Sequence, residues 1–113
     1  MVSAAQASVC ERFGVVPAPT QVGDRVGISP NVLTGLLPIN ALRHRAENDT
    51  SGWYIWAGEE LSDDPSFFVA LHVEHLEEWC PGILPYLALP PGYRVLLAPE
   101  FEDVWFDQAL LDI

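Results

Sequence analysis

The sequence predicts an α+β domain with a single, largely antiparallel sheet of about five strands and helices packed against it. Short stretches with strand-like patterns occur in both halves of the chain, and two stretches carry apolar residues at helical spacing. Prolines and glycines separate most of these stretches. A length of 113 residues suits one domain, with an N-terminal helix and connector at 1–23 and a core at 24–113.

The N-terminal segment is expected to be a short helix followed by a connector. Ser3 and Gln6 have the spacing of a capping box, in which each side chain bonds the other residue's backbone N–H. The apolar residues that follow recur at helical spacing, which predicts a helix over residues 4–13. Residues 14–23 contain two prolines and predict an irregular connector.

Three strands are expected before the middle of the chain. Residues 25–29 form a short candidate that ends before Pro30, and residues 39–45 form a second. Residues 53–57, Trp-Tyr-Ile-Trp-Ala, are apolar at every position. Because successive strand residues point to opposite faces, this pattern predicts a central strand covered at least in part on both sides, with its aromatic residues in the core.

Helices are expected next. Asp64 followed by Pro65 has the pattern of an N-cap with proline at the first helical position. Apolar residues at helical spacing then continue to Cys80, which predicts a helix that ends there. Residues 83–89 predict one or two further helical turns.

The C-terminal part is expected to be a β-hairpin. Strands are predicted at 93–98 and 104–107, with a loop at 99–103 between them. Trp105 alternates with two apolar neighbours. If those neighbours face the core, Trp105 faces outward, where it is either available to a partner or covered by a loop or helix of the chain.

The charge of the chain is strongly asymmetric. Residues 1–46 carry four arginines and two acidic residues, a net charge of +2, whereas residues 47–113 carry fourteen acidic residues and one arginine, a net charge of −13. The two sum to the formal net charge of −11, and the chain contains no lysine. A surface this negative repels itself, and its simplest use is the attraction of a cationic partner. Solubility is the alternative use.

Several partner classes and locations are disfavoured. Nucleic acid and anionic membranes need lysine and arginine, and no apolar run approaches the roughly 18 residues that span a bilayer. The first residues lack the basic and apolar regions of a signal peptide. We therefore predict a cytoplasmic protein that needs no cofactor, binds neither nucleic acid nor membrane, and keeps Cys10 and Cys80 as reduced thiols.

One cluster of potential metal ligands comprises His72, Glu74, His75 and Glu78. On a helix His72 and His75 would be neighbours, but the zincin motif places its two histidines four residues apart, and here they are three apart. Cys80 lies on the predicted apolar helix face, where a thiol is unreactive. Neither a metal site nor a catalytic residue is therefore predicted.

Residues 49–60, Asp-Thr-Ser-Gly-Trp-Tyr-Ile-Trp-Ala-Gly-Glu-Glu, resemble the acid–Ser–Gly–Trp … Gly–acid–Glu signature of family 33 of the polymorphic-toxin immunity proteins, earlier catalogued as a domain of unknown function. The resemblance covers about residues 24–113, and further similar segments are 26–32, 71–76, 87–93 and 102–107. The chain departs from the family by Thr50, which precedes Ser51, and by its extra N-terminal segment. The resemblance implies a small cytosolic protein that neutralises a cognate toxin, and it implies no catalytic residue.

We therefore predict a non-enzymatic immunity protein that binds a cognate toxin with a basic surface and occludes it. The acidic segments 59–64 and 100–107 follow or join expected strands, so both are expected in loops at sheet ends, where a rigid scaffold presents residues to a partner. Trp105 is the expected anchor. The predicted partner-binding residues are Glu59, Glu60, Asp63, Asp64, Glu100, Glu102, Asp103, Trp105 and Asp107.

Two other functions remain open. One is a small metal-dependent hydrolase that uses His72 and His75, which a metal assay would test. The other is an acidic interaction module with a partner that is not a toxin. The gene neighbourhood separates this module from an immunity protein, because an immunity gene should lie beside a toxin gene.

Overall fold

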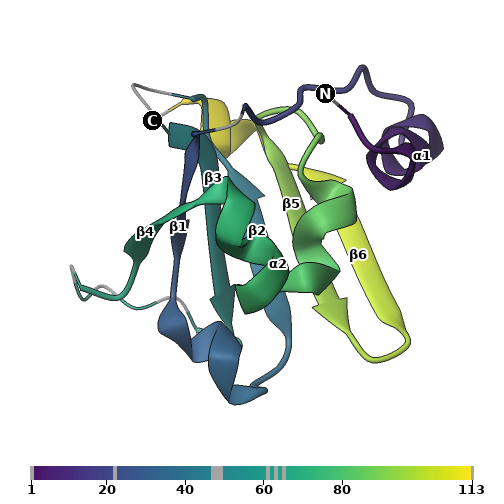
Figure 1. Ribbon diagram of the computed structural model, residues 1–113. Coiled ribbons are helices and arrows are strands. Elements are labelled where there is room, and N and C mark those ends of the chain that lie inside the picture. The colour runs from purple at the N-terminus through teal and green to yellow at the C-terminus, as the bar shows by residue number, and fades with distance from the viewer. Residues whose placement is uncertain are drawn as a thin grey trace.

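The computed structural model describes residues 2–21, 23–46, 50–60, 62, 64 and 66–112. Within these residues, six strands form a single sheet, α2 lies on one face of it, and α1 lies beside the sheet (Figure 1). The strands are β1 (Arg25–Ile28), β2 (Ile39–Arg43), β3 (Thr50–Ala57), β4 (Val69–His72), β5 (Tyr93–Ala98) and β6 (Phe101–Phe106). The helices are α1 (Ala4–Arg12), α2 (Leu76–Trp79) and the 3-10 helices η1 (Pro30–Thr34), η2 (Val73–His75), η3 (Pro81–Tyr86) and η4 (Gln108–Leu111).

The strand order is β4-β1-β3-β2-β5-β6. The β1–β3 pair is parallel and the other four pairs are antiparallel. The expected α+β class with a largely antiparallel sheet is therefore confirmed, with one more strand than expected. The middle of the sheet is β3, between β1 and β2, as the apolar sequence of residues 53–57 predicts.

One face of the sheet carries the main core. Residues paired across neighbouring strands point to the same face, and Ile55, Ala41 and Val95 form one such row, fully buried. Leu76 of α2 and Ile83 of η3 cover this face, and α1 packs against η3. In Figure 1, α2 lies in front of the sheet and α1 lies to the right of it.

The opposite face has thinner cover. Leu42 and Trp56 are buried there under Leu110 of η4, with Phe67 and Phe68 packed beside them. The ring centroids of Phe68 and Trp56 lie 6.2 Å apart. The expectation that β3 is covered on both sides is thus met at Trp53 and Trp56, but it is wrong at Tyr54, which is exposed in the same strand.

A buried arginine ties the core face to two distant segments. The Arg43 guanidinium donates to the carbonyl oxygens of Ser51 at 3.0 Å, Ala18 at 2.6 Å and Leu89 at 2.8 Å. Burial lowers its pKa to about 10, so the side chain remains protonated at neutral pH. The charge is solvated by backbone dipoles and lies 5.6 Å from the ring centroid of Trp53.

The expected helix between Asp64 and Cys80 is wrong. Residues 69–72 form β4, which pairs antiparallel with β1, and α2 is a single turn from Leu76 to Trp79. The open edge of β1 accepts these residues as a strand, so sheet pairing overrides their helical spacing. Pro65 lies outside the described residues.

The expected hairpin forms, with a shorter loop. The strand β6 begins at Phe101 instead of residue 104, and Ala98 pairs with Phe101 across a turn of two residues, Pro99 and Glu100. Glu100 has a φ of 59°, the left-handed conformation that a type II turn places at the residue after proline. Glu102 and Asp103 are therefore strand residues, and the expectation that they lie in a loop is wrong.

Candidate partner-binding surface

The edge strand β6 divides the predicted acidic segment between two faces. Glu102 pairs with Leu97 and therefore lies on the core side of the sheet. Asp103 and Trp105 lie on the opposite side, because neighbouring residues of a strand alternate. The strand thus presents two different surfaces, which the sequence alone treats as one.

Glu102 is engaged within the protein. Its carboxylate accepts hydrogen bonds from the guanidinium of Arg12 on α1 and from the hydroxyl of Tyr86 on η3. The Arg12 and Tyr86 hydrogen bonds hold the pKa of Glu102 below its ordinary value. Burial and the bond to Glu102 raise the pKa of Tyr86 to about 12. The group fastens α1 and η3 to the edge of the sheet.

Asp107 is also engaged. One carboxylate oxygen accepts from Arg94 Nε at 2.8 Å, and the other accepts from the backbone N–H of Ala109 at 3.0 Å. The second bond caps η4 at its N-terminus. Asp107 therefore stabilises the chain end that follows β6.

Trp105 lies on the outer side of β6 and is 38% exposed. It pairs with Arg94, and the same row continues through Leu42 to Tyr54 in β3. Val104 on the other side packs against the main core. The alternation expected from the sequence is present, since Val104 and Phe106 lie on one side of β6 and Trp105 on the other, but Phe106 is exposed and does not belong to the core.

The other predicted segment reaches the same end of the sheet as the hairpin turn. Glu59 and Glu60 are exposed just after β3, and Glu100 follows β5. Three strand spacings separate β3 from β6, roughly 14 Å across the sheet. Glu59, Glu60 and Glu100 thus border one sheet end, whereas Trp105 lies farther along β6.

Asp64 and Asp63 complete the predicted set. The Asp64 carboxylate accepts from the backbone N–H of Ser66 at 2.9 Å and from its hydroxyl at 2.8 Å. These bonds lower the pKa of Asp64 and mark a local turn. Asp63 lies outside the described residues.

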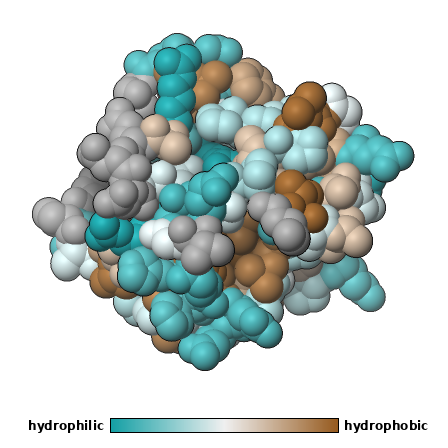
Figure 2. Space-filling view, turned by 45° about the horizontal axis from the view of Figure 1, so that its top comes forward, coloured by the Kyte–Doolittle hydropathy of each residue, from teal (hydrophilic) through white to brown (hydrophobic). Residues whose placement is uncertain are grey.

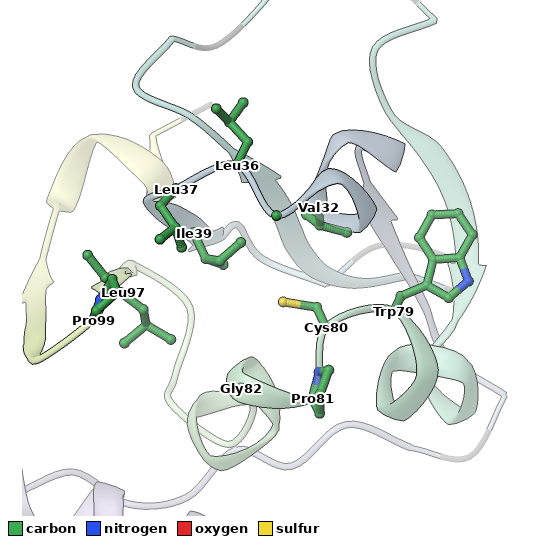
Figure 3. A pocket seen from close by; sticks show the side chains of 12 residues that line it. Val32, Leu36, Leu37, Ile39, Trp79, Cys80, Pro81, Gly82, Leu97 and Pro99 are labelled. Carbon is green, nitrogen blue, oxygen red and sulfur yellow. The ribbon is translucent and has the colours of Figure 1, made fainter.

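A pocket that the sequence did not reveal lies at this same sheet end (Figure 3). Its volume is about 340 Å³, and its lining comes from the loop before β2, the α2–η3 junction and the end of β5. The only signal in the sequence was the apolar run Leu36–Leu37 in a loop that Gly35 and Pro38 mark as irregular. Solvent-exposed leucines at such a position call for a packing or binding partner.

The residues considered for chemistry do not assemble into a reaction centre. The rings of His72 and His75 stack with centroids 6.5 Å apart, and Glu74 accepts from the backbone N–H of Gly23 at 3.0 Å. Among the described residues, no three His, Cys, Asp or Glu side chains are grouped as metal ligands would be. Burial raises the pKa of both Cys10 and Cys80, which favours the unreactive thiol form.

The comparison with family models identifies the chain. The model of the Imm33-like domain matches residues 5–107. The protein belongs to this family. The match begins inside α1, so the N-terminal helix is part of the Imm33-like domain, although the resemblance noted in the sequence covered only residues 24–113. Val9 and Cys10 of α1 are buried in the main core, which is the physical reason why the helix belongs to the domain.

Neither the curated proteins nor the solved structures include a match to this chain. No helix among the described residues is long and apolar enough to cross a membrane. The Imm33-like family makes the protein a member of an immunity-protein family, and immunity proteins act on toxins.

Proposed function

We propose that this Imm33-like protein binds a cognate antibacterial toxin in the cytoplasm and neutralises it by occlusion, with no catalytic activity of its own. Membership of the family is the observation that carries the proposal. Occlusion needs a complementary surface and no reactive group. The raised pKa values of the two thiols, which keep them protonated and unreactive, are consistent with this. Both cysteines are free and buried, as in a protein of a reducing compartment.

The outer side of the β5–β6 hairpin supports a binding role. Within the described part of the chain, the side chains of Glu100 and Asp103 form no ion pair, in contrast to Glu102 and Asp107. Trp105 stands beside Asp103 on this side, and its ring offers a large apolar area that a partner would desolvate. We propose that Glu100, Asp103 and Trp105, together with Glu59 and Glu60, form the contact surface.

Charge supports a basic partner. The net charge of −13 after residue 46 would attract a cationic protein from solution. Figure 2 shows the side of the molecule that carries α2, seen from its upper end, where hydrophilic and hydrophobic residues are intermixed. A toxin that acts on nucleic acid or nucleotides inside cells has a basic surface, which the negative charge of this protein would complement.

Co-expression with the toxin domain encoded beside this gene tests the proposal. Cells that produce the toxin should grow only with the Imm33-like protein, and a variant with Trp105→Ala, Glu100→Gln and Asp103→Asn should lose protection while it folds normally. The matched control is Glu11→Gln with Asp112→Asn, which removes the same two charges from exposed sites elsewhere. Growth arrest with the wild-type protein would refute the function, whereas full protection by the triple variant would move the surface elsewhere.

Metal content separates this proposal from a small hydrolase. We expect the purified protein to contain no stoichiometric zinc, iron or manganese, because His72 and His75 stack on each other instead of converging on one point. Elemental analysis decides the matter. About one metal per chain that is lost with His72→Ala would favour the hydrolase.

A further inference from the structure

The pocket at the sheet end has three walls drawn from distant parts of the chain. Leu36 and Leu37 belong to the loop before β2, Leu97 ends β5, and Cys80 joins α2 to η3. Figure 3 shows Leu37, Leu97 and the Cys80 sulfur around one hollow, with the Trp79 ring beyond Cys80. The lining is mostly apolar, so the hollow suits a hydrocarbon or aromatic group.

The leucines of the pocket rim are unusually exposed. Leu36 is 49% exposed and Leu37 is 47% exposed, and Leu33 nearby in η1 is more than half exposed. Three leucines within five residues form a cluster that costs free energy in water. Clusters of this kind mark contact sites more often than isolated apolar residues do.

The loop that carries these leucines is held in place by hydrogen bonds. Asn31 donates to the carbonyl oxygen of Ala57 and accepts from its N–H, both at 2.8 Å. Asn40 donates to the carbonyl oxygen of Gly58 at 2.6 Å, and the N–H of Gly58 donates to Pro38 at 2.8 Å. A β-carbon on Gly58 would lie 3.0 Å from Leu36, so the loop packs closely on the end of β3. A rigid rim loses little entropy when it binds.

The surroundings of the pocket carry one sign of charge. The chain segments that line or adjoin it are residues 30–41, 57–60, 77–83 and 96–102. Together they contain six glutamates and no arginine, lysine or histidine. Only Glu102 of the six is paired with an arginine among the described residues. An apolar hollow within an acidic ring complements an apolar side chain with basic neighbours.

We propose that this pocket receives an apolar side chain of the toxin that is flanked in the toxin sequence by arginine or lysine. The inference rests on the proposed function and names the anchor point for the same partner. Glu100 belongs to both surfaces, since it follows Pro99 of the pocket wall and precedes the outer side of β6. The toxin would therefore cover the sheet end and the hairpin as one continuous interface.

Binding of the purified toxin domain to single variants tests the inference. Leu37→Glu places a charge in the hollow and should weaken the complex at least about 30-fold, as loss of a central anchor does. Val16→Glu is the matched control, because it makes the same change at an apolar residue that is 82% exposed in the N-terminal connector. Circular dichroism and thermal unfolding verify that both variants fold.

The outcomes separate the inference from the proposed function. If the wild-type protein and both variants bind the toxin equally, the pocket is no anchor and the inference fails while the function stands. If the wild-type protein itself does not bind, both fail. Sedimentation equilibrium of the protein alone tests whether a second copy fills the pocket. A dimer that dissociates with Leu37→Glu but not with Val16→Glu would show that it does, and would overturn the inference.

Short capped peptides test the pocket without the toxin. In a titration followed by NMR, Arg-Leu-Arg should shift the methyl signals of Leu37 and Leu97 and the amide signals of Gly35 and Gly82. Arg-Ser-Arg should have a much weaker effect because it lacks the apolar group, and Asp-Leu-Asp because its charge is wrong. Equal shifts with all three peptides, or none with Arg-Leu-Arg at millimolar concentration, would overturn the inference.

Discussion

The strands β3 and β6 contain similar residues and use them in opposite ways. Trp53 in β3 is fully buried, and its Nε1–H donates to the carbonyl oxygen of Leu87 at 3.0 Å. Trp105 in β6 lies at the edge of the sheet and is 38% exposed. Both are tryptophans in a strand with apolar neighbours on either side. The difference arises from their places in the sheet, because Trp53 lies on a central strand and faces the main core, whereas Trp105 lies on the edge strand and faces the opposite side.

This comparison shows how the position of an aromatic residue in the sheet decides whether its ring joins the core or stays in contact with solvent. A central tryptophan loses its water on folding and contributes to the core. An edge tryptophan keeps part of its surface in contact with water, and only a bound partner would exclude that water. The acidic residues follow the same division, since Glu102 binds inward to Arg12 and Asp103 faces outward.

The sharpest test of the comparison is the loss of stability on truncation. Trp53→Ala should lower the free energy of unfolding by about 3–5 kcal/mol, because it leaves a cavity in the core and removes the Nε1–H that donates to the Leu87 carbonyl. Trp105→Ala should cost less than about 1 kcal/mol. Urea unfolding measures both. Similar losses for the two variants would mean that Trp105 is part of the core.

In binding, unlike in stability, truncation of Trp105 should have a large effect. Trp105→Ala should weaken the toxin complex by at least about 2 kcal/mol, whereas a rim residue contributes much less. Phe106→Ala is the matched control, because Phe106 lies on the same strand, is also exposed and points to the opposite face. Calorimetric titration gives both affinities. An equal loss at Phe106 would place the contact on the core side of β6.

Salt should act on the rate of association. The negative charge after residue 46 should raise the on-rate at low ionic strength, and the Debye length falls from about 10 Å at 0.1 M to about 3 Å at 1 M. We expect the on-rate to fall by a factor of about ten or more across this range. Stopped-flow kinetics would show it. An on-rate that does not change with salt would mean that the acidic residues serve only solubility.

The smallest expected effect is a pH dependence from the inward side of β6. The folded-state pKa of Glu102 is below its ordinary value of 4.5, so its contribution to stability is complete above that pH and is lost as the pH falls through the lower value. The pKa of Tyr86 is raised from 10 to about 12, so its contribution is complete below pH 10 and is lost as the pH rises through about 12.

Glu102→Gln tests this dependence. The variant should show a flatter loss of stability below pH 4.5 in urea unfolding than the wild-type protein, because the ionised group that Arg12 favours is gone. Asp103→Asn serves as the control, since Asp103 is on the outer side of the same strand. If both variants have the wild-type profile, the Arg12–Glu102 pair contributes nothing measurable.

Local patterns predicted those parts of the fold that depend on local contacts. The capping box of Ser3 and Gln6 forms, with Gln6 N–H donating to Ser3 Oγ at 3.1 Å, and α1 ends at Arg12. Residues 69–80 show where such patterns fail. Their helical spacing was real, yet the backbone of residues 69–72 pairs with β1, whose edge is brought near only by the whole fold.

The candidate site was predicted only in part for the same reason. Trp105 was found because strand alternation is a local rule. The inward pairing of Glu102 required Arg12, which is ninety residues away in the sequence, and Tyr86 on a third element. The pocket required three segments to meet at one sheet end. The pattern of residues within one segment does not predict contacts between segments that are distant in the sequence.

The sequence by itself determined the fold class, the central position of β3, the charge imbalance and the family that the chain resembles. These follow from composition and short-range pattern, because burial, turns and net charge are properties of neighbouring residues. Only the tertiary structure decided that Glu102 is bound inward, that Tyr54 is exposed, that residues 69–72 are a strand and that Leu36 and Leu37 border a pocket. Each of these depends on which distant segments become neighbours, and that choice is made by the free energy of the whole packed chain.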